Sequence, residues 1–258
     1  MTTRLWDRAA ALPARSGERS PQLVALSPGL PDLAELFTFM RDAELRFQTL
    51  KMRIEERVFA ARGEQLTVMD ISLRHPGHAR VVTSEPGKGA VAPSEIWLSD
   101  GETVRTYSTS HKLATQRPVR NRPRGLASGD LPGTSKVYEP ITPLPTETLA
   151  ELFVHPAGYC QNVLATGECW ISGTEVFPWG ESIVVECDHP RSVERDNDRP
   201  DYHIQIAVDR HEGVITRLAE SVKGELTRLA TVVVLDPDAT LPPSVFELEL
   251  PEGTTTLY

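Results

Sequence analysis

The feature that most constrains this chain is a short reversal between two segments typical of β-strands. Residues 94–98 and 103–107 carry isoleucine, tryptophan, valine and tyrosine, which suit a pleated surface, and Asp100-Gly101 lies between them. An Asp-Gly pair tolerates the positive φ angles that a two-residue hairpin turn requires. The sequence therefore predicts a β-hairpin here, and with it a sheet.

Residues 50–60 allow two interpretations. Leu50 and Ile54 suit one face of a helix, but apolar and charged residues also alternate through the segment, as they do in a half-buried strand. We favour the strand because Arg62-Gly63 can reverse the chain and residues 66–73 again contain β-branched side chains. The segment then predicts a second hairpin.

The last part of the sequence has the pattern of a strand meander. Turn-forming residues recur there at short intervals, among them His211-Glu212-Gly213, Lys223-Gly224 and residues 237–243. These turns separate four expected extended segments, residues 202–209, 214–220, 226–235 and 245–250.

Two helices are expected beside these strands. Asp32 and Glu35 have the spacing of a capping box, and an apolar stripe follows them. Thr146 is expected to cap a shorter second helix. The stripe of the first helix comprises Leu33, Leu36, Phe37, Met40, Ala43 and Phe47, and the second helix turns Leu149, Leu152 and Phe153 inward.

The short connections predict that consecutive strands pair antiparallel. We therefore expect an α+β fold, in which one large curved antiparallel sheet wraps around a few helices. Residues 1–30 are interrupted by proline, glycine and serine, and are expected to form a flexible N-terminal arm. Residues 31–258 are expected to form a single domain.

The overall charge argues against a general affinity for nucleic acid. Lysine and arginine number 27 against 36 aspartates and glutamates, and the formal net charge of −9 repels phosphates on average. No apolar run approaches the ~18 residues that a membrane-spanning helix needs. The apolar segment near the N-terminus is too short for a signal peptide, so a cytoplasmic location is expected.

No metal site, cofactor or catalytic residue is predicted. The three cysteines form no Cys-x-x-Cys pair, and His75-Pro76-Gly77-His78 is typical of a turn. A Gly-x-Ser-x-Gly elbow, a phosphate-cradling glycine loop and a dinucleotide fingerprint are all missing. Cys160 and Cys169 would oxidise together only if the fold brings them close, and we expect packed, reduced thiols.

The order of these elements carries a family resemblance. It is strongest in Ile96-Trp97-Leu98-Ser99-Asp100-Gly101, in Val208-Asp209-Arg210-His211-Glu212-Gly213-Val214-Ile215 and in residues 245–253. The chain resembles the LolA/LolB-like lipoprotein-carrier superfamily over residues 32–253. That superfamily includes periplasmic lipoprotein carriers, the RseB-type sensor domain and mycobacterial lipid-binding lipoproteins. The resemblance implies an unclosed β-barrel wrapped around helices, with an apolar cavity between them.

The concave side of such a sheet is where a ligand is expected. Methionine and aromatic side chains suit an adaptable apolar pocket, although the same residues often form an ordinary core. Glu56 interrupts the apolar face of its strand, so it could serve as an acid, a base or a ligand anchor; the plainer alternatives are that it lies at a sheet edge or pairs with an arginine. The side chains that we expect to line the pocket are Phe37, Met40, Phe47, Met52, Ile54, Glu56, Trp97, Tyr107 and Phe153.

A basic stretch without any acidic residue lies between Glu102 and Asp130. Guanidinium groups offer paired donors to phosphate, sulfate or carboxylate, so an anion site is one interpretation. A solvated loop that balances the acidic remainder is the other. The candidate anion-binding residues are Arg117, Arg120, Arg122 and Arg124.

These features favour a non-catalytic module that binds an apolar or amphipathic, lipid-like small molecule between sheet and helices. Two alternatives stay open. One is a regulatory protein that acts through protein–protein contacts of residues 1–30 or 118–145. The other is an enzyme that uses Glu56 or His111 as an acid or base.

Overall fold

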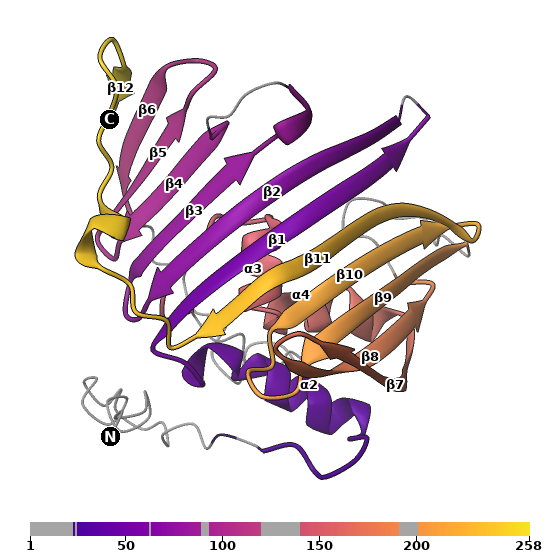
Figure 1. Ribbon diagram of the computed structural model, residues 1–258. Coiled ribbons are helices and arrows are strands. Elements are labelled where there is room, and N and C mark those ends of the chain that lie inside the picture. The colour runs from indigo at the N-terminus through magenta and orange to yellow at the C-terminus, as the bar shows by residue number, and fades with distance from the viewer. Residues whose placement is uncertain (1–22, 24, 62, 89–92, 120–139, 191–200) are drawn as a thin grey trace, which may run out of the picture.

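One large sheet dominates the computed structural model, which describes residues 23, 25–61, 63–88, 93–119, 140–190 and 201–258 (Figure 1). Its strands are β1 (Thr49–Ala60), β2 (Gly63–Arg74), β3 (His78–Ser84), β4 (Glu95–Asp100), β5 (Thr103–Ser108), β6 (Leu113–Pro118), β7 (Glu168–Phe177), β8 (Gly180–Asp188), β9 (Tyr202–Asp209), β10 (Ile215–Val222), β11 (Glu225–Pro237) and β12 (Thr255–Leu257). They follow one another in the order β12-β6-β5-β4-β3-β2-β1-β11-β10-β9-β8-β7. Neighbours are antiparallel, except that β12 and β6 are parallel.

Helices cover one side of this sheet, which we call the inner face. The helical elements are α2 (Leu33–Arg41), α3 (Leu149–Val154) and α4 (Ala157–Asn162), with the short 3-10 turns η1 (Ala43–Leu45), η2 (Pro86–Lys88), η3 (Leu164–Thr166) and η4 (Pro243–Phe246). In Figure 1, α3 and α4 lie behind β1, β11 and β10, and α2 runs along the lower end of the sheet. β7 and β12 end the strand order without pairing with each other, so the barrel is unclosed. The predicted α+β fold with an open, mostly antiparallel sheet is confirmed.

Both hairpins predicted from the sequence are present. β1 pairs with β2 along its whole length, so residues 50–60 form a strand and the helical alternative is wrong. β4 and β5 flank Asp100-Gly101. Asp100 Oδ1 accepts the backbone N–H groups of Glu102 at 3.0 Å and Thr103 at 2.7 Å, which holds the turn closed. Gly101 has a φ of 92°, which glycine adopts without steric cost.

α2 begins where the sequence predicted. Asp32 Oδ1 accepts the N–H of Glu35 at 2.7 Å and caps the first turn. The helix ends at Arg41, whose guanidinium donates two hydrogen bonds of 2.9 Å to the buried carboxylate of Asp42. It is therefore shorter than the predicted stripe, which ran on to Phe47.

The buried face of α2 also differs from the predicted stripe. Leu36, Phe39 and Met40 are the buried residues, whereas Phe37 is only partly buried against the core. The ring of Phe39 lies beneath the guanidinium of Arg46, 3.8 Å from ring centroid to Cζ. The spacing of Leu36, Phe39 and Met40 is that of a helical face, so the sequence contained this signal.

Residues 245–250 are not the strand that we predicted. The chain forms η4 followed by an irregular segment, because prolines at 242 and 243 lack the N–H that a ladder needs. The ring of Phe246 lies 4.8 Å from the guanidinium carbon of Arg74. Arg80 donates to the carbonyl oxygens of Val245 at 3.0 Å and Glu247 at 3.1 Å. The segment therefore covers the outer face of β3 and β4.

Other local predictions need correction. β3, β6, β7, β8 and β12 were not predicted. β7 shows why: its charged, apolar and glycine residues follow no regular alternation, and no residue in it is fully buried. The second helix is capped by Thr148, whose hydroxyl accepts the N–H of Glu151 at 3.4 Å, and not by Thr146. Leu149 and Phe153 are buried as expected.

Phe153 gives a direct test of this packing. Its side chain is fully buried, so truncation to alanine leaves a cavity beneath α3. We expect Phe153→Ala to lower the free energy of unfolding in urea by about 3–5 kcal/mol. The exposed Val176, changed to alanine as a control, should alter it by less than about 0.5 kcal/mol. A loss below about 1 kcal/mol for Phe153→Ala would contradict the packing.

Candidate ligand-binding site

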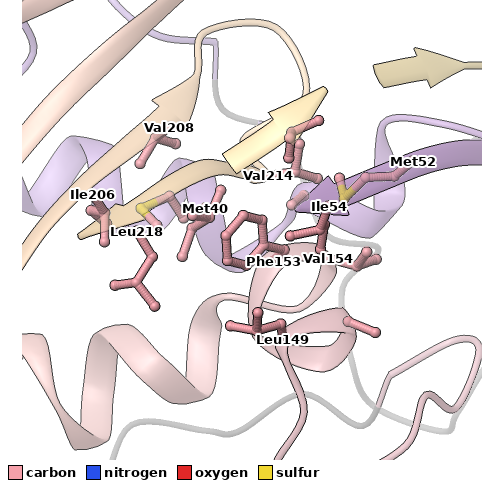
Figure 2. Packing of buried hydrophobic residues seen from close by; sticks show 14 of the residues in the cluster. Met40, Met52, Ile54, Leu149, Phe153, Val154, Ile206, Val208, Val214 and Leu218 are labelled. Carbon is pink, nitrogen blue, oxygen red and sulfur yellow. The ribbon is translucent and has the colours of Figure 1, made fainter. Parts of the chain in front are cut away.

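The inner face of the sheet is an apolar wall. Ile54 of β1 pairs with Val232 of β11, and Leu218 of β10 pairs with Ile206 of β9, so their side chains share this face. Helical side chains complete the packing from the other side. Figure 2 shows Met40, Met52, Ile54, Leu149, Phe153, Ile206, Val208 and Leu218 converging from α2, α3 and the sheet.

Most of the predicted apolar site residues lie in this layer. Met40, Met52, Ile54 and Phe153 are 0% exposed and Phe47 is 1% exposed. A side chain with no exposed surface touches no water-sized space, so these residues fill the layer with one another. A ligand would reach them only if the covering helices move.

Trp97 and Tyr107 lie on opposite faces of the sheet. Trp97 pairs with Val81 and Thr106, and Val81 pairs with Ile71 of the inner wall. Tyr107 instead pairs with Ile96, one position away in the register. Since successive strand residues point to opposite faces, Tyr107 is buried on the outer face. The prediction that Tyr107 lines the inner side is wrong.

Glu56 is part of a charged cluster on the inner face. Arg228 of β11 donates from Nε to Glu56 Oε1 at 2.7 Å, and its Nη1 lies 3.7 Å from Glu220 Oε1 of β10. Burial lowers the pKa of Arg228, but Glu220 and Glu56 together raise it further, so the guanidinium stays charged. The expected pairing of Glu56 with an arginine is therefore present. Two carboxylates facing one guanidinium leave the cluster with a net charge of −1.

Tyr159 of α4 lies over this cluster. Its hydroxyl is buried and has no hydrogen-bond partner among the described residues. Burial raises the pKa of Tyr159, and Glu220 and Tyr202 raise it further, so the hydroxyl keeps its proton. The site thus holds one unused donor beside an excess carboxylate charge.

Sequence reasoning found Glu56 but missed the rest of this cluster. Arg228 lies on the same face of its strand as the apolar residues Ala230 and Val232. A charged residue on an otherwise apolar face was a usable signal once the strand was predicted. Tyr159 gave no such signal, because the helix that carries it is only six residues long.

A second polar cluster fastens residues 140–148 to the core. Glu44 Oε2 accepts the N–H of Ile141 at 3.0 Å. His155 Nε2 lies 3.1 Å from the carbonyl oxygen of Thr142, and the Thr142 hydroxyl lies 2.7 Å from His75 Nδ1. All these groups are buried or nearly so.

The hydrogen bonds settle the protonation of this second cluster. A carbonyl oxygen only accepts, so His155 Nε2 carries a proton and, in a neutral ring, Nδ1 is left as an acceptor. Glu44 Oε2 lies 3.3 Å from that Nδ1. Burial raises the pKa of Glu44 to about 8, and burial lowers the pKa of His155 to about 4. Burial likewise lowers the pKa of His75 to about 3, so at pH 7 the cluster is neutral.

The candidate anion-binding arginines are only partly within the described residues. Arg117 lies exposed near the end of β6. Arg120, Arg122 and Arg124 lie outside the described residues. Arg105 of the same basic stretch contacts Asp100 at 3.4 Å. Anion binding by Arg117 to Arg124 stays a prediction.

A surface pocket of about 540 Å³ lies away from the predicted site. Its charged lining residues are Arg210 and Glu181, and the Arg210 guanidinium already contacts Glu181 at 3.2 Å and the carbonyl oxygen of Ser27 at 2.9 Å. In the part of the chain that the structure describes, no three His, Cys, Asp or Glu side chains group as a metal site. None of its helices is long and apolar enough to cross a membrane.

Comparison with known proteins finds likeness at the level of structure only. No protein-family model and no curated protein matches this sequence. Among solved structures, MucB is similar at 12% identity over 84% of this chain and 62% of that chain, with a TM-score of 0.49. A LolA superfamily protein from Nitrosomonas europaea is similar at 10% identity, over 85% and 99% of the two chains, with a TM-score of 0.35. Lipoprotein LppX from Mycobacterium tuberculosis is similar at 9% identity, over 81% and 100%, with a TM-score of 0.41.

These structures include a LolA superfamily protein and a mycobacterial lipoprotein, two of the groups that the sequence resembles. The open sheet and its covering helices have the architecture that the resemblance implied. Identities this low show architecture and leave the ligand and partners of this chain to proposal.

The same comparison corrects the predicted location. LppX is named as a lipoprotein, and MucB has been solved in complex with MucA(peri). These names point away from the cytoplasm and count against the cytoplasmic location expected from the sequence. That expectation rested on the composition of the N-terminal residues alone.

Glu44 makes the stability of the protein depend on pH. Its folded-state pKa of about 8 lies above the usual 4.5, so the stability linked to its bound proton is complete at low pH and is lost as pH rises toward 8. We expect Glu44→Gln to remove this loss. The difference in unfolding free energy between variant and wild type should then grow by up to about 1.4 kcal/mol per pH unit between about pH 5 and 8.

Urea unfolding at several pH values measures this difference. Glu252→Gln, at an exposed position, is the matched control and should run parallel to wild type. The histidines act in the opposite direction, because their lowered pKa values remove stability as pH falls below about 6.5. A constant offset between Glu44→Gln and wild type across the range would contradict the buried neutral carboxyl.

Proposed function

We propose that the protein binds an apolar or amphipathic small molecule between the inner face of the sheet and helices α3 and α4, without covalent chemistry. Residues 31–258 would act as one domain in this role. The observation that carries the proposal is the cluster of Glu56, Arg228 and Glu220 set into an otherwise apolar wall, with the Tyr159 hydroxyl unpaired beside it. A buried donor without a partner is costly, and a ligand group that accepts its proton removes that cost.

Entry of the ligand requires the cover to move. α3 and α4 have six residues each, too few for a stable isolated helix, so contacts with the sheet hold them in place. A molecule that replaces those contacts can displace the helices without breaking the strand ladder. Burial of about 300 Å² of its apolar surface would contribute about 7 kcal/mol before the cost of association.

The charge of the cluster selects the head group. A net charge of −1 repels a carboxylate head group. A hydroxyl or an amine is favoured instead, because it can accept a hydrogen bond from Tyr159 or donate one to Glu220. An anionic head would instead need Arg117 or the arginines at 120, 122 and 124 outside the described residues.

Displacement of the neutral dye N-phenyl-1-naphthylamine tests this order of preference. Dodecanol and dodecylamine should displace the dye at lower concentration than laurate. Tyr159→Phe should weaken dodecanol binding about tenfold, since one hydrogen bond is lost, yet leave the unfolding free energy unchanged or raised. Tyr258→Phe, at a 95% exposed position, is the control. Failure of all three ligands to displace the dye, or preference for laurate, would contradict the proposal.

A protein-contact role is the second candidate. Among the described residues β7 pairs only with β8, so its other edge offers free N–H and C=O groups. Val176 is 81% exposed and Trp170 is 42% exposed along this strand. Such an edge accepts an extended segment of a partner. MucB, similar in structure, has been solved with MucA(peri), which supports a test of this role. Val176→Lys should then abolish a partner contact and leave dye binding intact.

The enzyme alternative has less support from the geometry. Glu56 is engaged with Arg228, and His111 lies exposed in the turn between β5 and β6. The two candidate acids or bases therefore come from separate parts of the sheet.

A further inference from the structure

Two cysteines lie directly opposite each other at the edge of the sheet. Cys169 of β7 and Cys187 of β8 are partners in the antiparallel register. Residues opposite each other in such a pair have Cα atoms about 4.5–5.5 Å apart, within the range that a disulfide spans. The sequence had considered Cys160 and Cys169 as the pair, and the register now supplies a different partner.

The sulfur atoms of this pair point to the same place. Cys169 Sγ lies 3.0 Å and Cys187 Sγ lies 3.5 Å from the carbonyl oxygen of Leu164. The two thiols also lie close enough to shift each other's pKa, down for Cys169 and up for Cys187. Cys160 is turned away, with its Sγ 3.7 Å from Met40 Sδ in the core.

We propose that Cys169 and Cys187 form an oxidation site that closes to a cross-strand disulfide and staples the edge strand β7 to β8. The inference stands apart from the proposed ligand, because it uses only the register and the thiols. Such a bridge would persist in an oxidising compartment outside the cytoplasm.

The accessible thiol starts the reaction. Cys169 is partly exposed, whereas Cys187 is fully buried. The neighbouring Cys187 thiol lowers the pKa of Cys169, which favours its thiolate, whereas the same contact and burial raise the pKa of Cys187. Burial also raises the pKa of Cys160, which keeps that thiol inert.

A small disulfide such as oxidised glutathione serves as the oxidant. The Cys169 thiolate attacks one sulfur of it, forms a mixed disulfide and releases one glutathione thiolate. Cys187 then loses its proton, attacks the Cys169 sulfur and expels the second glutathione. Two protein thiols are oxidised, one disulfide is reduced, and the two protons pass to the glutathione thiolates.

Intact mass spectrometry of the full chain after incubation with oxidised glutathione tests the proposal. We expect the loss of two hydrogen atoms, and alkylation of one thiol after unfolding where the reduced protein has three. Peptide mapping should join the segments that contain Cys169 and Cys187 and leave Cys160 alkylated. The bridge should raise Tm by about 5 °C, a rise that reduction reverses.

Variants separate this pair from the alternatives. Cys160→Ser should form the bridge as wild type does, and Cys169→Ser and Cys187→Ser should not. A disulfide that includes Cys160, a glutathione adduct that persists on Cys169, or three alkylated thiols after oxidation would each overturn the proposal. The mapping uses wild-type protein, so the test stands even if a serine variant fails to fold.

Discussion

The need to cover one face of an open sheet is the constraint on which the rest of this structure depends. The wall that runs through Ile54, Leu218, Ile206 and Val185 would be costly to leave in water. α2 is long enough to be capped and aligned by its own sequence. α3 is capped by Thr148, yet α3 and α4 have only six residues each, so they depend on contacts with the rest of the core. The covering helices and the sheet therefore stabilise each other. The two short helices are the least stable part of this packing.

Two polar clusters beneath the cover differ in how completely they are satisfied. The cluster of Glu44, His155 and Thr142 is neutral, and it fastens the chain that leads into α3. The cluster of Glu56, Arg228 and Glu220 keeps its charge and faces the unpaired hydroxyl of Tyr159. The first has the features of a structural anchor. The second has the features of a place where a ligand completes the hydrogen bonding.

Turns and helix caps could be predicted from the sequence where a single residue type determines the local conformation. Asp100-Gly101 and the Asp32 cap were predicted correctly because turn and cap geometry depend on few atoms. The strand predicted for residues 245–250 was wrong. Apolar residues alternate there as in a strand, but two prolines just before the segment lack the N–H groups that a strand ladder needs. β7 was missed because an edge strand needs no apolar alternation.

The site was less predictable than the fold, because it depends on register. Glu56 was identifiable as a carboxylate on an apolar face, but its partner Arg228 comes from a strand 172 positions away. Trp97 and Tyr107 were equally good candidates by residue type, and a register difference of one position put them on opposite faces. Cys187 became the partner of Cys169 for the same reason. Spatial pairing across strands is the information that a single sequence does not carry.

Amide hydrogen exchange of the native protein, followed by mass spectrometry, tests the central claim that α3 and α4 are a displaceable cover over the inner face. The account predicts that residues 149–162 exchange through openings far less costly than global unfolding, while β1 and β11 exchange only with it. Addition of dodecylamine should change protection in residues 149–162 and leave the strands as they were. Exchange of these helices only through global unfolding, with no response to the ligand, would contradict the account.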